Sequence, residues 1–181
     1  MDLSKYDNSE FDRGKPVFVE VIWRLVQSFF VSTSIPGSKL RIFILTLFGA
    51  KIGKNVVMKP GIKVTFPWKL EIQENSWIGE NAWLDNLAFI RIGKNCCISQ
   101  AVYLCTGNHD WSKNSFDLQL GEIFLEDQVW VGARSSIGPG VRLSRGSIVT
   151  LGSALYSNTT PFGIYGGVPA QHIKDRKKFN E

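Results

Sequence analysis

Residues 125–155 read LEDQVWVGARSSIGPGVRLSRGSIVTLGSAL, and an aliphatic side chain returns at every sixth position of this stretch. The positions are Leu125, Val131, Ile137, Leu143, Val149 and Leu155. Earlier runs keep the same step, with a slip of two residues between runs: Ile52, Met58, Val64, Leu70; then Ile72, Ile78, Leu84, Ile90; then Ile92, Ile98, Leu104. A fixed period of this kind is typical of repeat architectures, so the sequence predicts stacked structural units over residues 50–160.

Each hexad also carries small residues at defined places. Glycine follows the aliphatic residue at Gly53, Gly79, Gly93, Gly132 and Gly138, as expected for tight backbone corners. Small or β-branched residues stand four positions after it, at Ser76, Ala82, Ala88, Cys96, Val102, Val129, Ser135, Val141, Ser147 and Ser153. One large and one small inward residue per hexad suits a narrow core. The pattern predicts a parallel β-solenoid with three faces and roughly 18 residues per coil.

The first 49 residues have a helical period instead. Residues 17–31 place apolar side chains at steps of three and four, which predicts an amphipathic helix: Phe18, Ile22, Leu25 and Phe29. Pro36 and Gly37 break the chain, and residues 39–48 predict a second short helix. These helices hold more apolar side chains than free surface helices need. We therefore expect them to cap the open first coil, with weak contact to a bilayer surface in addition.

Composition excludes several classes of protein. The 21 Lys and Arg against 16 Asp and Glu give a modest net charge of +5, which suits an anionic ligand or acidic membrane surface but does not predict nucleic-acid binding. Three cysteines make a poor disulfide framework and favour a reducing compartment. Without a signal peptide or a spanning run, we expect a cytoplasmic protein, with peripheral contact at the inner face of the membrane. The two histidines, His109 and His172, exclude a three-histidine metal site within one chain, and we expect no metal.

Several motifs together resemble a known family. They are I-G-K-N at 52–55 and 92–95, L-F-G-A-K-I-G at 47–53, I-S-Q-A-V-Y-L-C-T-G-N-H-D at 98–110, V-W-V-G-A at 129–133 and G-G-V-P-A at 166–170. The chain resembles the hexapeptide-repeat acyltransferases, and most closely the polysaccharide-biosynthesis O-acetyltransferases exemplified by the colanic acid enzymes. The resemblance implies an all-β fold, a left-handed parallel β-helix. Its parts would be capping helices within 1–49, the repeat at 50–160 with a loop at 110–122, and a C-terminal short helix or tail at 161–181.

His109 stands where the repeat fails, because the hexad register is lost after Leu104 and returns at Leu125. An excursion from a rigid scaffold is a favoured place for a site, and histidine is a good general base near neutral pH. A surface-loop histidine without a role is the alternative. The resemblance implies acetyl transfer from acetyl-CoA to a hydroxyl, with His109 taking the hydroxyl proton and no acyl-enzyme.

Four neighbours of His109 are candidates for orienting it or binding the acceptor. Asn108 occupies a position that the repeat keeps small and inward, and Asp110 either orients the imidazole or caps its own turn. Asp85 and Asn86 interrupt the hexad one coil earlier, where they either reach the same groove or stand as solvated corner residues. Cys105 is close enough in sequence to suggest a Cys–His pair, but its place in the hexad favours a corner residue.

The resemblance also implies where acetyl-CoA binds. It would lie along the outside of the later coils, in a groove shared by neighbouring subunits of a homotrimer. Ala133, Leu151 and Gly152 match backbone contacts of related enzymes, and Lys174 matches a residue that reaches the nucleotide phosphate. Arg176, with Lys177 and Lys178, adds positive charge to this tail, although a solvated tail is the alternative. The chain departs from the family at Tyr156-Ser157, where a Thr-Lys pair is common, so the tail could replace part of the phosphate contact.

Three functions remain open on the sequence. The first is an O-acetyltransferase acting on a sugar of a polysaccharide, on its lipid-linked repeat unit or on a related glycoside. The second is an N-acetyltransferase of an amino sugar nucleotide, which would use the same coil and base. The third is a non-enzymatic β-solenoid scaffold, which would predict an uninterrupted repeat without a histidine at the break. Carbonic anhydrases of this fold need three histidines and are excluded.

Overall fold

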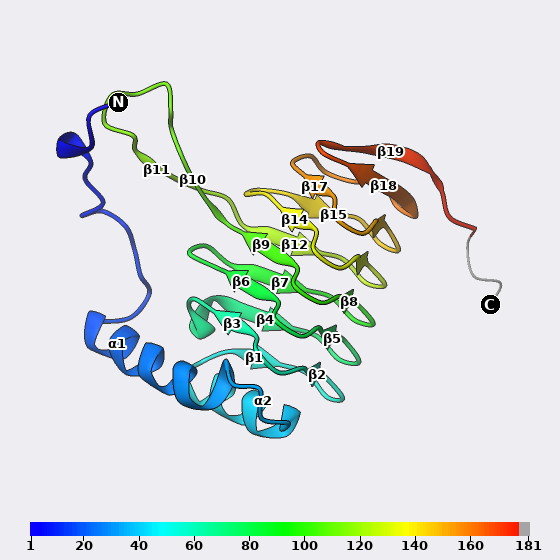
Figure 1. Cartoon of the computed structure of the whole chain (residues 1–181), viewed down its shortest axis with the longest axis horizontal. Helices are drawn as coiled ribbons and strands as arrows, with labels where there is room; N and C mark the ends of the chain where they lie inside the picture. The colour runs from blue at the N-terminus through cyan, green and yellow to red at the C-terminus, as the bar shows by residue number, and fades with distance from the viewer. Residues whose placement is uncertain (178–181) are drawn as a thin grey trace.

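The body of the protein is a parallel β-solenoid (Figure 1). The computed structural model describes residues 1–177. Strands of successive coils pair side by side in three parallel sheets, which confirms the predicted parallel β-helix. The first sheet holds β1 (Lys51–Ile52), β4 (Leu70–Ile72), β7 (Ile90–Ile92), β12 (Ile123–Leu125) and β15 (Arg142–Leu143).

The second and third sheets form the other two faces. The second sheet holds β2 (Val57–Met58), β5 (Trp77–Ile78), β8 (Cys97–Ile98), β13 (Trp130–Val131) and β16 (Ile148–Val149), followed by β18 (Gly163–Gly167) and β19 (Ala170–Asp175). The third sheet holds β3 (Lys63–Val64), β6 (Trp83–Asp85), β9 (Tyr103–Cys105), β14 (Ser136–Ile137) and β17 (Ala154–Leu155). A short 3₁₀ turn, η3 (Pro67–Lys69), precedes β4.

The aliphatic residues of the hexads fill the core. Of the seventeen positions quoted above, sixteen are 2% exposed or less, and only Ile52 in the first coil is half-buried. Their strict alternation with outward residues follows from the period of two along each strand. The core runs continuously through the coils, and each hexad contributes one aliphatic side chain to it. This is why the sequence has a period of six.

The coils before β10 have 20 residues rather than the expected 18. Ile52 pairs with Ile72, and Ile72 pairs with Ile92. The two-residue slips fall inside three-residue strands, where Leu70 and Ile72 both point inward from β4. After β12 the spacing drops to 18 residues, since Leu125 pairs with Leu143.

The hexad glycines serve a different purpose from the one expected. None of the five has a positive φ; that conformation falls at other corner residues such as Asn55 and Asn95. A Cβ at Gly53 would lie 2.6 Å from the backbone nitrogen of Glu74, and one at Gly132 would lie 2.6 Å from that of Leu151. Glycine is required here because the backbone of the next coil approaches too closely for any side chain.

The N-terminal helices cover the open end of the first coil (Figure 1). They are α1 (Val17–Val26), a π-helical turn η2 (Gln27–Val31) and α2 (Ser38–Leu47), so both predicted helices are present. Trp23, Val31 and Leu45 are fully buried, and the indole N–H of Trp23 donates to the Val64 carbonyl at 2.9 Å. The predicted cap is confirmed.

Two segments differ from the sequence predictions. The excursion expected as a loop at 110–122 is present, but it is anchored by an antiparallel hairpin: β10 (Gly107–His109) pairs with β11 (Leu118–Leu120), and residues 110–117 connect them. The expected C-terminal helix is wrong, because β18 and β19 form an antiparallel hairpin that extends the second sheet. The end of the tail, with Lys178, lies outside the described residues.

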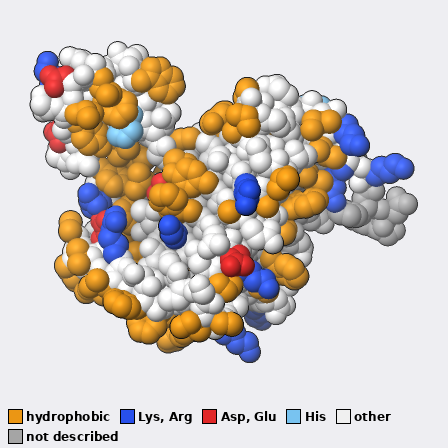
Figure 2. All heavy atoms as spheres, in the orientation of Figure 1, with side chains coloured by type: hydrophobic (Ala, Val, Ile, Leu, Met, Phe, Trp, Pro, Cys, Tyr) orange, Lys and Arg blue, Asp and Glu red, His pale blue; other side chains and the backbone are white. Residues whose placement is uncertain are grey.

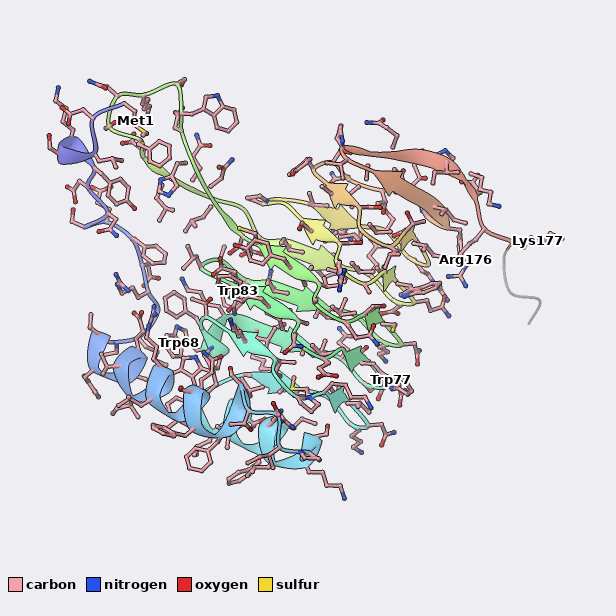
Figure 3. The ribbon with its side chains drawn as sticks, in the orientation of Figure 1. Met1, Trp68, Trp77, Trp83, Arg176 and Lys177 are labelled. Atoms are coloured by element: carbon pink, nitrogen blue, oxygen red, sulfur yellow. The ribbon has the colours of Figure 1, made fainter. Side chains whose placement is uncertain are left out.

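An N-terminal arm, residues 1–16, joins the hairpin to the helices. It includes the 3₁₀ turn η1 (Leu3–Lys5), and the Asp2 N–H donates to the Asn114 carbonyl at the hairpin tip. The indole of Trp68 donates to the Arg13 carbonyl at 2.6 Å near the start of α1. Figure 3 shows Met1 beside the hairpin tip, with Arg176 and Lys177 at the opposite side of the molecule.

Candidate functional site

His109 lies on the β10–β11 hairpin, which leaves the solenoid at the corner between the third and first sheets. His109 pairs with Leu118, and Asn108 pairs with Gln119. Because neighbouring side chains on a strand point to opposite faces, Asn108 and His109 lie on opposite faces of the hairpin. The structure therefore does not bring Asn108 together with His109 within one chain.

The imidazole of His109 is held in one orientation. Its Nδ1 lies 2.8 Å from the Phe116 carbonyl, and a carbonyl only accepts, so Nδ1 carries the proton and Nε2 is the free acceptor of the neutral ring. The Phe116 ring stacks on the imidazole at 4.2 Å with an interplanar angle of 2°. Tyr6 of the arm lies at 5.5 Å from it. A base that must take a proton at Nε2 needs this tautomer.

Phe116 and Tyr6 were not found from the sequence. Phe116 has a φ of +54°, a conformation that non-glycine residues seldom adopt and that occurs at functional sites. Its ring and its carbonyl both contact His109. Neither residue belongs to a hexad, so the repeat contained no signal for them.

Asp110 caps its own turn and does not orient His109. Its Oδ1 accepts from the Ser112 N–H at 3.0 Å and from the Ser112 hydroxyl at 2.5 Å. These hydrogen bonds, with the side-chain bond first, lower the pKa of the Asp110 carboxyl. Of the two alternatives for Asp110, the structure selects the turn.

Asn86 is a structural residue rather than an acceptor contact. It is fully buried; its Oδ1 accepts from the Phe66 N–H at 2.8 Å, and its Nδ2 donates to the carbonyls of Phe66 and Lys69. Its amide is thus engaged on both sides by backbone groups of the preceding coil. Asn86 fits neither alternative given for it, because a fully buried amide that bonds backbone groups is neither an acceptor contact nor a solvated corner residue.

Asp85 is half-buried at the corner that the hairpin leaves. It accepts from the Thr65 hydroxyl and from the Tyr103 hydroxyl, both at 2.8 Å, and it pairs with Cys105 across the sheet. Burial, followed by the hydrogen bonds at Cys105 and Asp85, raises the pKa of Tyr103. Asp85 therefore lies at the end of β6, which pairs with the last strand before the hairpin, and two hydroxyl groups hold its carboxylate in place.

An open cleft of about 750 Å³ separates the N-terminal arm from this corner and from β11. Its charged lining residues are Asp7, Glu10, Asp12, Asp117, Glu122 and Lys69. His109 is not among the lining residues, but its pairing partner Leu118 is. Carboxylates accept hydrogen bonds from hydroxyl groups, so a cleft of this composition suits a hydroxyl-rich ligand.

The residues proposed to bind the acyl donor fall into two places. Ala133, Leu151 and Gly152 meet at the corner between the second and third sheets, where the Gly152 N–H donates to the Ala133 carbonyl at 2.9 Å and Leu151 is 72% exposed. Lys174, which pairs with Ile164, and Arg176, whose guanidinium donates to the Gly146 carbonyl, lie toward the other end of these strands. The structure thus brings Ala133, Leu151 and Gly152 together at one corner. Lys174 and Arg176 do not lie at that corner.

His109 and the Ala133 corner are also on different corners of the solenoid. The hairpin leaves between the third and first sheets, and Ala133 lies between the second and third. Within residues 1–177, no group of three or more His, Cys, Asp or Glu residues could hold a metal ion. In the same range, no helix combines the length and the hydropathy that crossing a bilayer requires.

Comparison with known sequences finds a relative along almost the whole chain. The chain is 34% identical over 176 residues to WcaF of Escherichia coli K12, which carries the name of a colanic acid biosynthesis acetyltransferase. The matched region covers 97% of this chain and 97% of that protein. No protein-family model matches the chain.

Solved structures show the same architecture. A maltose O-acetyltransferase from Clostridium difficile superposes with a TM-score of 0.81 at 21% identity, covering 90% of this chain and 88% of that one. A hexapeptide-repeat acetyltransferase from Vibrio cholerae, solved with acetyl-CoA, superposes with a TM-score of 0.78 at 21% identity, covering 89% and 87%. At this identity the two structures establish the fold that they share with this chain.

Proposed function

Because the chain belongs to the hexapeptide-repeat acetyltransferase family that includes WcaF, we propose that it transfers an acetyl group from acetyl-CoA to a sugar hydroxyl in polysaccharide or glycoconjugate biosynthesis. The observation that carries the proposal is the 34% sequence identity to WcaF, which extends over 97% of both chains. The oriented imidazole of His109 supplies a group able to do this chemistry. An acceptor that is a lipid-linked repeat unit would place the reaction at the inner face of a membrane, and peripheral contact there is part of the proposal.

The mechanism that we propose is direct transfer. Acetyl-CoA supplies a thioester whose carbonyl carbon accepts the acceptor oxygen. Nε2 of His109 takes the proton from the acceptor hydroxyl while the Nδ1–H stays bonded to the Phe116 carbonyl, which stabilises the imidazolium that forms. The imidazolium then returns this proton to the leaving thiolate. Backbone N–H groups or a bound water would stabilise the oxyanion.

The residues of the later coils are suited to hold the donor. Ala133, Leu151 and Gly152 form an exposed corner, and a Cβ at Gly152 would meet nothing within 4 Å, so the backbone there is open to a ligand. Lys174 and Arg176 offer positive charge for phosphate groups further along the second sheet. An acetyl-CoA molecule that extends from the Ala133 corner along the strands of the second sheet would contact both this corner and the two basic residues.

Binding of the donor can be tested without knowing the acceptor. Acetyl-CoA should raise the melting temperature of the wild-type protein, since a ligand that binds only the folded state stabilises it. Ala133→Glu, which places a carboxylate at the proposed contact, should reduce the shift. If the wild-type protein shows no shift at millimolar acetyl-CoA, the scaffold function is favoured instead.

Direct transfer predicts that Cys105→Ala retains turnover within a few-fold of wild type, because no acyl-enzyme forms on a thiol. The other cysteines are poor nucleophiles: burial raises the pKa of Cys96 to about 11 and also raises that of Cys97. Release of the coenzyme A thiol measures turnover. A loss of two orders of magnitude, together with an acetylated Cys105 peptide in the wild-type protein, would instead establish a covalent intermediate.

We propose that the protein works as a homotrimer, and the contrast between two of the solenoid faces supports this. The outward residues of the second sheet form an apolar row: Val57, Trp77, Cys97, Trp130, Ile148 and Ile164. The first sheet carries a largely charged row instead: Lys51, Glu71, Arg91, Phe124 and Arg142. Trp77 is 56% and Trp130 is 48% exposed in the single chain. A neighbouring subunit would cover the apolar row and could bring its own Ala133 corner to His109.

Light scattering at micromolar concentration should give three times the 20.3 kDa mass of the chain. Trp130→Glu should dissociate the assembly and abolish turnover together, because a charge would replace an apolar contact. Arg91→Gln on the charged face is the matched control and should change neither. A wild-type monomer with full turnover would refute the shared site.

A further inference from the structure

The outer surface of the N-terminal helices is an apolar face that no other element within residues 1–177 covers. Eleven large apolar side chains of this segment are each at least 48% exposed: Val17, Phe18, Val21, Ile22, Leu25, Phe29, Phe30, Ile35, Leu40, Phe43 and Leu47. Figure 2 shows hydrophobic side chains gathered along the lower left rim of the molecule, where Figure 1 places α1 and α2. We call these eleven side chains the outer helix face.

The outer helix face is not needed to close the solenoid. The cap is made by other side chains of the same helices, Trp23, Val31 and Leu45, which are fully buried. Each of the eleven side chains is about half to two-thirds exposed. Together they expose an apolar area on the order of 1,000 Å². The largest apolar patch of a typical soluble monomer is about 300–600 Å². The outer helix face therefore exceeds what a capping role explains.

The charges around the outer helix face have one sign. Glu20 is the only acidic residue between positions 17 and 48; it is 5% exposed and paired with Arg13 and Arg24. The exposed charges of this segment are Arg24 and Lys39, both basic. Lys51, in the first strand after α2, is also exposed but forms an ion pair with Glu71. An apolar helix surface whose own exposed charges are basic and whose single carboxylate is buried matches the surface of an anionic lipid bilayer, where acyl chains lie beneath negative headgroups.

We propose that the outer helix face docks the enzyme on an anionic lipid bilayer, with α1 and α2 lying in the interface. The helices cover one end of the solenoid, and the His109 hairpin and the Ala133 corner lie further along it (Figure 1). The docked enzyme would keep both exposed. In a trimer of side-by-side solenoids, three outer helix faces would lie at one end and bind together. The inference rests on the proposed function only in that a lipid-linked acceptor would be found at such a surface.

Sedimentation of the full-length protein with lipid vesicles tests the docking directly. We expect it to pellet with vesicles of phosphatidylethanolamine and phosphatidylglycerol, less with pure phosphatidylcholine, and less at high salt. The double variant Phe29→Glu/Phe43→Glu should lower the apparent affinity by at least about tenfold, because both side chains leave the apolar layer. Lys39→Glu should lower it by at least about fivefold, because the loss of one basic charge alone has this effect and the glutamate adds repulsion from the headgroups.

Matched measurements separate docking from folding and from catalysis. Ile173→Glu changes an exposed apolar residue of β19, on the opposite hairpin, and should leave vesicle binding unchanged. The Phe29→Glu/Phe43→Glu protein should keep its melting temperature and its turnover of a water-soluble acceptor, because neither side chain touches the core. The proposal is overturned if the wild-type protein fails to pellet, if the double variant pellets equally well, or if the double variant instead dissociates a complex between copies of the chain. Loss of acetyl transfer with vesicle binding intact would refute the proposed function alone.

Discussion

Replacing His109 with alanine should lower turnover by about 10²–10⁴-fold while the protein stays folded, since this is the usual contribution of a positioned general base. The imidazole is the group whose tautomer the structure fixes: Nδ1 is committed to the Phe116 carbonyl, and the ring is stacked on Phe116 beside Tyr6. An alanine leaves no acceptor for the hydroxyl proton. Initial rates of coenzyme A release at saturating acetyl-CoA measure the effect.

His172→Ala is the matched control for this experiment. His172 lies on β19, where its Nε2 pairs with Asp175, and it is remote from the β10–β11 hairpin. Its replacement should leave turnover near that of the wild-type protein. The acetyl-CoA-induced rise in melting temperature should survive in His109→Ala, because the base does not hold the donor. Near-wild-type turnover of folded His109→Ala would refute the proposed mechanism.

Trp23→Ala should destabilise the protein by about 3–5 kcal/mol, the usual cost of removing a fully buried large aromatic side chain. The change would leave a cavity between α1 and the first coil, where Trp23 contacts Phe48 at a ring distance of 5.1 Å. It would also remove the donor to the Val64 carbonyl. Since small domains are stable by only about 5–15 kcal/mol, the loss should appear as a large drop in the unfolding midpoint.

Phe29→Ala separates the two faces of the same helical segment. Phe29 is 68% exposed on the outer helix face, so its truncation should change the stability by less than about 0.5 kcal/mol. Urea unfolding followed by far-ultraviolet circular dichroism compares the two variants. Equal midpoints for Trp23→Ala and wild type would contradict the role of the helices as a cap.

The period of six predicted the solenoid because inward and outward residues alternate in fixed register through every coil. Sixteen of its seventeen aliphatic positions are in the core, and the helix predicted over residues 17–31 spans α1 and η2. The capping role was also predictable, because an open coil end needs apolar cover. Which side of the helix is buried was not predictable: the four side chains whose spacing predicted it (Phe18, Ile22, Leu25 and Phe29) all lie on the outer helix face, and the buried aromatic side chain is Trp23.

The repeat could not predict what departs from it. The β10–β11 pairing joins residues nine to thirteen positions apart in antiparallel register, and no hexad encodes it. The C-terminal hairpin does have a local signal in the sequence, because Gly166-Gly167-Val168-Pro169 is a turn sequence.

Within the site, sequence position identified His109 but not its partners. Asn86 and Asp110 are polar residues near the break in the repeat, and sequence alone could not tell a ligand contact from a backbone bond. The Phe116 carbonyl is a backbone group, so no side-chain pattern could indicate it. The positive φ of Phe116 is a property of the folded backbone, and the sequence does not indicate it.

The central claim is acetyl transfer to a sugar hydroxyl with His109 as the base, and product identification tests it most directly. The wild-type protein is incubated with acetyl-CoA and a panel of glycosides that includes amino sugar nucleotides, and each product is then treated with mild alkali. The account predicts coenzyme A release with at least one glycoside, a product whose acetyl ester is cleaved by alkali, and neither in a His109→Ala blank. An alkali-stable acetamide would establish an N-acetyltransferase, and no release by a folded protein that binds acetyl-CoA would contradict the account.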